Sequence, residues 1–121
     1  MSGRPLILVV DGNRANLTLL SQQLRHEGYE ALSAGSLEEF DKVLNEQTSL
    51  SLSLMDLSGF DQRIWLRCEE LRKAKVPFII ISAQRSPTMQ RDSMKHGASG
   101  LLVKPVGVKA LMEYIHTLLG D

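Results

Sequence analysis

Short apolar runs alternate with stretches of helical periodicity along the chain, five times in succession. Most of these runs are continuous rather than alternating with polar residues, which is typical of strands that are covered on both faces of a sheet. The runs predict strands at residues 6–10, 29–34, 50–55, 78–81 and 101–103. The third run is more polar than a central strand usually is, because Ser51 and Ser53 interrupt it.

Apolar residues at spacings of three and four predict the helices between these strands. Gly28 is well placed to end the first helix, and Ser36 with Glu39 forms a capping box before the second. Ser86 followed by Pro87 predicts the start of the fourth helix. The apolar stripes are Leu17, Leu20 and Leu24, then Leu37, Phe40, Val43 and Leu44, then Ile64, Cys68 and Leu71, and finally Leu111, Tyr114, Ile115 and Leu118.

Five strand–helix units without a linker, repeat or low-complexity stretch predict an α/β fold. We expect a doubly wound, five-stranded parallel sheet with five helices, flavodoxin-like and in the strand order 2-1-3-4-5. One domain would span residues 1–121, with its core at about residues 6–119. Ligands of such sheets bind at the carboxyl ends of the strands. The residues that follow the apolar runs there are Asp11, Asp56, Ser82 and Lys104.

The composition narrows the class of protein further. The 121 residues include 14 Lys and Arg and 14 Asp and Glu, and a formal charge of zero argues against a nucleic-acid binder. Hydrophobic residues make up 43% of the chain, which is enough for a packed core. No apolar run is long enough to span a membrane, and the first residues carry no signal-peptide pattern. Cys68 is the single cysteine, so a disulfide framework is excluded and a cytoplasmic location is expected.

Asp11 and Asp56 follow the first and third strands, which are neighbours in the expected order. Adjacent strands lie about 4.8 Å apart, and two carboxylates this close repel unless a cation or a shared proton lies between them. Oxygen ligands without His or Cys suit a hard ion such as Mg²⁺. Lys104 would add an amine and Ser82 a hydroxyl. Such a group of side chains is suited to accept a phosphoryl group on an aspartate.

Four motifs in this order resemble those of the bacterial response-regulator receiver domains, the CheY-like family. They are Ile7-Leu8-Val9-Val10-Asp11, then Met55-Asp56, then Ile79-Ile80-Ile81-Ser82-Ala83, and finally Gly97-Ala98-Ser99-Gly100 leading to Val103-Lys104-Pro105. The resemblance extends from Leu6 to Leu119. It implies that Asp56 is the phosphoacceptor and that Mg²⁺ is held by Asp11, Asp56 and the backbone carbonyl of Ser58. It also implies that Ser82 and Lys104 sense the phosphoryl group and that the peptide bond before Pro105 is cis.

The resemblance further implies a role in signal transduction rather than an enzyme. A sensor histidine kinase or a phosphotransfer protein of a two-component phosphorelay would be the partner. Phosphorylation would then switch a protein-interaction surface formed by the fourth helix, fifth strand and fifth helix, which could serve an output domain or a separate protein. The sequence leaves open whether the chain is a complete protein or part of a longer one.

Three departures from the family pattern fall close to the chemistry. Gly12 replaces the second acid of a pair, which is normally the direct metal ligand, so we expect weakened Mg²⁺ binding. The loop after Asp56 is two residues shorter than the family pattern, which leaves open whether the Ser58 carbonyl reaches the metal. Leu101 stands at the position of the switch aromatic, so the usual aromatic gate cannot operate.

The departures allow two interpretations. The chain is either a tuned phosphoacceptor, or a pseudo-receiver that keeps the fold as a phosphorylation-independent protein-interaction module. The presence of Asp56, Ser82 and Lys104 favours the first slightly. Met89 and Met94 are almost the only large apolar residues of the fourth helix, which is compatible either with an exposed docking face or with packing by unidentified neighbours.

Overall fold

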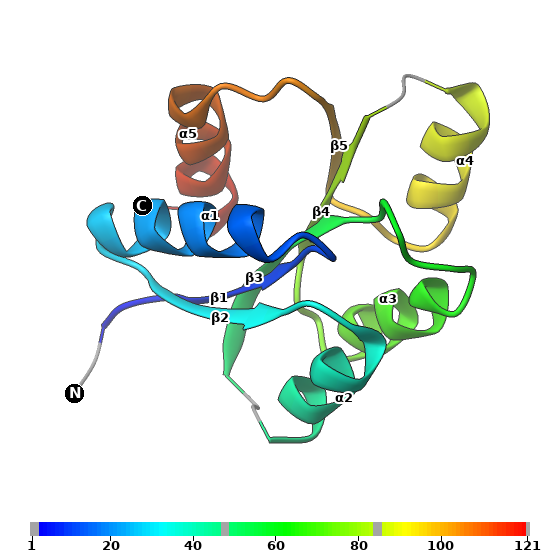
Figure 1. The fold of residues 1–121 in the computed structure, drawn as a ribbon, viewed down its shortest axis with the longest axis horizontal. Helices are drawn as coiled ribbons and strands as arrows, with labels where there is room; N and C mark the ends of the chain where they lie inside the picture. Colours follow the sequence, from blue (N-terminus) through cyan, green and yellow to red (C-terminus); the bar gives the residue numbers. More distant parts are fainter. Residues whose placement is uncertain (1–2, 47–48, 84–85, 121) are drawn as a thin grey trace.

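The chain folds into a five-stranded parallel sheet with helices on both of its faces (Figure 1). The computed structural model describes residues 3–46, 49–83 and 86–120. The strands are β1 (Leu6–Val10), β2 (Glu30–Ala34), β3 (Leu50–Asp56), β4 (Phe78–Ser82) and β5 (Gly100–Val103). They pair in the order β2-β1-β3-β4-β5, which confirms the predicted doubly wound fold.

Five helices alternate with these strands along the chain. They are α1 (Arg14–His26), α2 (Leu37–Glu46), α3 (Ile64–Lys73), α4 (Pro87–Lys95) and α5 (Val108–Leu119). Figure 1 shows α1 and α5 together on one side of the sheet and α2 and α3 on the other. Helix α4 lies against the edge strand β5. Because each connection crosses from one parallel strand to the next, all five strands end at the same edge of the sheet.

The core consists of two apolar layers that share the sheet. Successive residues of a strand point to opposite faces. Ile7 and Val9 of β1 therefore pack with residues of α1 and α5, such as Leu24 and Ile115. Leu8 and Val10 belong to the opposite layer, whose helical members are Phe40, Ile64, Cys68 and Leu71. Burial on both faces explains why the strands read as continuous apolar runs.

The polar interruption of β3 is accommodated by a hydrogen bond inside the sheet. Ser53 is fully buried, and it lies opposite Leu8 of the neighbouring strand β1. Its hydroxyl donates to the Leu8 carbonyl oxygen at 3.1 Å. A buried hydroxyl without a partner would destabilise the fold, and this bond removes that penalty.

Local sequence signals set the helix ends largely as predicted. Ser86 caps α4, since its hydroxyl accepts from the backbone amide of Met89 at 3.3 Å, and Pro87 is the first helical residue. Gly28 follows the end of α1 with a φ of 95°, a left-handed conformation that glycine adopts without strain.

The capping box before α2 differs from the prediction in one half. The amide of Glu39 donates to the Ser36 hydroxyl at 3.2 Å, as expected. The Glu39 carboxylate accepts from the amide of Gly35 at 2.6 Å, whereas a capping box would direct it to Ser36. The guanidinium of Arg14 lies 2.8 Å from the same carboxylate and draws it toward α1.

The boundaries of several strands differ by one residue from the predicted apolar runs. β3 and β4 each include one further residue, Asp56 and Ser82 respectively, whereas β2 begins at Glu30, one residue later than predicted. Asp56 pairs in register with Ile81, and Ser82 pairs with Val103. Both polar residues are therefore held by the sheet rather than by a loop.

Helix α4, which the structure describes in full, contributes no side chain to either apolar layer. Of its residues, all of which the structure describes, Ser93 alone is buried, and the side chain of Met94 is 58% exposed. This packing favours the interpretation of α4 as an exposed face over that of a helix held by unidentified neighbours. No helix in the described ranges is both long and apolar enough to cross a membrane.

We expect Ser53→Ala to lower the free energy of unfolding by about 1 kcal/mol, since the variant loses a buried hydrogen bond. Chemical denaturation at an unchanged m-value measures this loss. Ser51→Ala is the matched control, because Ser51 lies in the same strand but is only half-buried. An equal loss of stability in both variants would show that the Ser53–Leu8 bond is not what stabilises this position.

Candidate functional site

Two buried carboxylates lie side by side at the carboxyl edge of the sheet. Asp56 ends β3 and Asp11 directly follows β1, and these strands are paired up to the residues before the two aspartates. Asp11 is 8% exposed and Asp56 is 4% exposed. A backbone amide two residues further along fixes each carboxylate, that of Asn13 for Asp11 and that of Ser58 for Asp56, both at 2.9 Å. The predicted juxtaposition of the two acids is therefore present.

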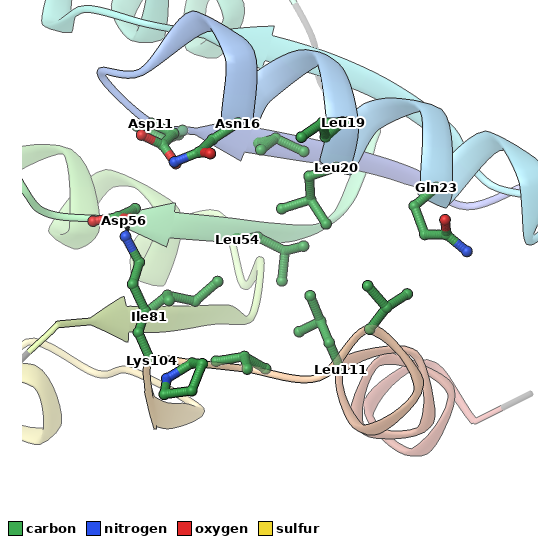
Figure 2. A pocket seen from close by; sticks show the side chains of 15 residues that line it. Asp11, Asn16, Leu19, Leu20, Gln23, Leu54, Asp56, Ile81, Lys104 and Leu111 are labelled. Carbon is green, nitrogen blue, oxygen red and sulfur yellow. Dashed lines mark ion pairs between the residues drawn. The ribbon is translucent and has the colours of Figure 1, made fainter.

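The amine of Lys104 completes this group. Lys104 follows β5, and its Nζ forms an ion pair with the Oδ2 atom of Asp56 (Figure 2). Its backbone amide donates to the carbonyl of Ser82 at 2.8 Å, which ties the segment after β5 to the end of β4. The peptide bond between Lys104 and Pro105 is cis.

The carboxylates hold the lysine in its charged form. The hydrogen bond to Asp56 raises the pKa of the Lys104 amine above its ordinary value, the charges of Asp56 and Asp11 add to this, and partial burial opposes it. Because the raised pKa belongs to the folded state, this interaction contributes fully to stability below the ordinary lysine pKa, as long as the two carboxylates are ionised. The contribution is lost as the pH rises through the raised value.

Ser82 and Leu101 lie on the adjacent strands β4 and β5 and have different surroundings. Ser82 is 8% exposed and ends β4 beside the strand that carries Asp56. Its hydroxyl is therefore at the same edge as the two acids. Leu101 lies within β5 opposite Ile80 and packs against the apolar layer of α2 and α3. An aliphatic side chain thus fills the position at which the sequence comparison expected an aromatic ring.

The carbonyl of Ser58 lies close to Gly12. A Cβ atom placed on Gly12 would lie 3.6 Å from this oxygen, which is an ordinary van der Waals distance. The Ser58 carbonyl and a side chain at position 12 would therefore face one another beside Asp11. Gly12 does not have a positive φ, so a larger residue could adopt its backbone conformation.

The potential metal ligands at this edge of the sheet are of the type that a hard divalent cation prefers. They are the carboxylates of Asp11 and Asp56 and the carbonyl of Ser58, all of them oxygen atoms. Within residues 3–46, 49–83 and 86–120, no group of three or more His, Cys, Asp or Glu side chains could hold a metal ion. Two carboxylates, one of them paired with Lys104, provide less negative charge than a three-acid pocket would.

A cavity of about 710 Å³ opens beside these residues, between α1 and α5. Figure 2 shows Asp11, Asp56 and Lys104 at one end of it and leucine side chains of α1 and α5 further along. The sequence analysis missed Leu19 and Val108 of this cavity, which are 66% and 50% exposed. Leu19 is an apolar residue outside the buried stripe of α1, and this position off the stripe was the sequence signal for its exposure.

Comparisons with known proteins agree with this fold. The family model "Response regulator receiver domain" matches residues 7–116. The polar-differentiation response regulator DivK of Brucella ovis is 28% identical over 120 residues, covering 95% of this chain and 96% of DivK. The two-component response regulator ORR3 of Oryza sativa subsp. indica is 29% identical over 108 residues, covering 84% of this chain and 81% of ORR3.

A solved structure is similar over nearly the whole chain. It is that of a CheY-like response regulator receiver domain protein from Methanospirillum hungatei, with a TM-score of 0.88 and 27% sequence identity. The alignment covers 98% of this chain and 95% of the other. The arrangement of strands and helices described above is therefore shared with an experimentally determined protein.

Proposed function

Because the chain belongs to the response regulator receiver domain family, we propose that it accepts a phosphoryl group on Asp56 from a sensor histidine kinase or a phosphotransfer protein. Receiver domains are signalling modules of two-component systems rather than typical enzymes, and no turnover is proposed for this one. The observation that carries the proposal is the contact of the Lys104 amine with the Asp56 carboxylate beside Asp11. This arrangement combines a nucleophile with a cation that can pair with incoming phosphoryl oxygens.

The proposed transfer forms one bond and breaks one bond. A carboxylate oxygen of Asp56 attacks the phosphorus of a phosphohistidine, the phosphorus–nitrogen bond breaks, and the leaving imidazole keeps the electron pair. The amide of Ser58 holds the Oδ1 atom of Asp56, so the carboxylate stays oriented while Lys104 turns to the new phosphoryl oxygens. The hydroxyl of Ser82 would donate a hydrogen bond to the same phosphoryl group.

Asp11, Asp56 and the Ser58 carbonyl would hold Mg²⁺. When bound, this ion neutralises negative charge on the phosphoryl oxygens. We propose that the ion binds more weakly than in a pocket with three acids, because Gly12 contributes no carboxylate. The proximity of the Ser58 carbonyl to Gly12 supports this ligand set despite the shortened loop.

Phosphorylation would add roughly 1.5 to 2 negative charges at Asp56 and draw Lys104 and Ser82 toward it. Both residues lie at the ends of β4 and β5, so their movement could be transmitted to the face formed by α4, β5 and α5. The thin packing of α4 and the exposure of Met94 support this face as the one that contacts an output domain or a protein partner. With Leu101 on β5, the change would proceed without an aromatic switch.

A phosphorylation-independent interaction module is the second candidate. The absence of an acid at Gly12 and of a ring at Leu101 favours it, as does the ion pair that already occupies Asp56. In either case we propose a single domain over residues 1–121, with its core at about residues 6–119, that acts in the cytoplasm.

Acetyl phosphate with Mg²⁺ is expected to add one phosphoryl group to the wild-type chain, and Asp56→Asn should abolish this, since the amide is not a nucleophile. Intact mass measures the gain directly. Asp61→Asn is the matched control, because Asp61 is an exposed aspartate of the following loop, paired with Arg63. Labelling of Asp56→Asn would assign the nucleophile elsewhere, and an unlabelled wild type would favour the interaction module.

Gly12→Asp should raise the affinity for Mg²⁺ by about tenfold or more, because the new carboxylate faces the Ser58 carbonyl and Asp11. Calorimetric titration with Mg²⁺ measures the dissociation constants. Gly107→Asp adds the same charge at an open position before α5 and should leave the affinity unchanged. Equal Mg²⁺ affinity of the wild type and Gly12→Asp would rule out position 12 as the missing ligand.

A further inference from the structure

The cavity between α1 and α5 has the dimensions of a small-molecule site. Its volume of about 710 Å³ falls within the roughly 300–1,000 Å³ of typical ligand pockets. Side chains of three neighbouring strands, Val9, Leu54 and Ile81, belong to its lining. Figure 2 shows the cavity running from the acidic end of the sheet along α1 toward α5.

The walls of the cavity are mostly apolar and partly exposed. Leu19 and Leu20 contribute from α1, and Val108 and Leu111 contribute from α5. In the described part of the chain four large hydrophobic side chains are exposed, and two of them, Leu19 and Val108, border this cavity. Exposed apolar surface at the rim of a cavity marks a place where an apolar group can be removed from water.

Among the described residues that line the cavity, two carboxylates, Asp11 and Asp56, face one amine, Lys104, so one negative charge is in excess. Lys104 forms its ion pair with Asp56, and within the described ranges the carboxylate of Asp11 accepts a hydrogen bond from the amide of Asn13. The nearby guanidinium of Arg14 is paired with Glu39 at 2.8 Å, so its charge is compensated. The Asp11 side chain is only 8% exposed, and removing an ionised carboxylate from water costs free energy. A cation beside the carboxylate would offset part of this desolvation cost.

We propose that this cavity binds a small amphipathic cation. An ammonium or guanidinium head group would pair with Asp11, and an aliphatic or aromatic body would lie between Leu19 and Leu20 on one side and Val108 and Leu111 on the other. The negative charge at the acidic end favours a positively charged head group, and the apolar walls favour an apolar body. The amide side chain of Asn16 lies beside Asp11 and can accept a hydrogen bond from the head group, whereas Gln23 lines the far end of the cavity (Figure 2).

Binding of this ligand would affect the neighbouring cation site. The organic head group and a divalent cation would both require Asp11, so each would oppose the other. The weaker metal site proposed above, with no acid at Gly12, would leave Asp11 more accessible to the competing cation. The proposal does not depend on phosphorylation of Asp56, since it rests on the charge and shape of the cavity in the unmodified chain.

Three probes with the same chain length and different head groups test the proposal. Octylamine, octanoate and octanol are titrated into the full chain below the concentrations at which they self-associate, and the methyl NMR signals of leucine and valine are followed. Octylamine should bind saturably and about tenfold more tightly than octanol, with octanoate weakest, because its amine forms a charge-assisted hydrogen bond. The shifts should be concentrated at Leu19, Leu20 and Val108.

Single substitutions distinguish the contribution of the Asp11 charge to binding from that of the apolar wall. Asp11→Asn should abolish the preference for octylamine over octanol, and the same methyl spectra report whether this variant is folded. Leu19→Gln should weaken all three probes at least threefold. Leu66→Gln should change none of them, because Leu66 is a comparably exposed leucine, 65% against 66%, on α3 and away from the cavity.

Equal affinities for the three probes, or a higher affinity for octanoate than for octylamine, would overturn the proposal. Shifts of equal size at Leu66 would also overturn it, since they would mean general partitioning onto exposed apolar residues. A preference for octylamine that survives in Asp11→Asn would show that another acid binds the head group, and would equally contradict the assignment.

Discussion

The charge balance among two buried carboxylates and one lysine amine governs the carboxyl edge of this sheet. In-register pairing of β1 and β3 brings Asp11 and Asp56 together, and neither can move away without breaking strand hydrogen bonds or its bond to a backbone amide. Lys104 compensates one of the two charges. The remaining negative charge is what makes this edge attractive to a cation, whether it is a metal ion or an organic ammonium group.

The scaffold and the site depend on different parts of the sequence. The fold is stabilised by apolar side chains of the strands that are buried on both faces of the sheet, whereas the site consists of the polar residues that end or follow those strands. Gly12 lies outside both apolar layers, and Leu101 packs against one of them as an aliphatic side chain, so the fold is kept with both residues in place. The two layers explain how a chain only 27% identical to a solved receiver domain shares its fold with a TM-score of 0.88.

The fold was predictable because its strands are continuous apolar runs and its helices have regular stripes. Asp11, Asp56 and Lys104 were found for the same reason, since each lies at or next to the end of such a run. Details that depend on tertiary contacts were not predictable. The carboxylate of Glu39 accepts from the amide of Gly35 rather than that of Ser36, and it is paired with Arg14. The cavity bordered by Leu19 depends on the spacing of α1 and α5, two helices that are distant in sequence.

The central claim is that the Lys104 amine is held at the Asp56 carboxylate beside Asp11, and the titration of its Nζ by NMR tests this most directly. With ¹⁵N-labelled lysine side chains, Lys104 should lose its proton at a pH above the ordinary lysine pKa. Asp56→Asn should remove most of that difference, because the hydrogen bond to Asp56 is its largest cause. Titration of Lys104 at the ordinary lysine pKa, unchanged by Asp56→Asn, would contradict the account.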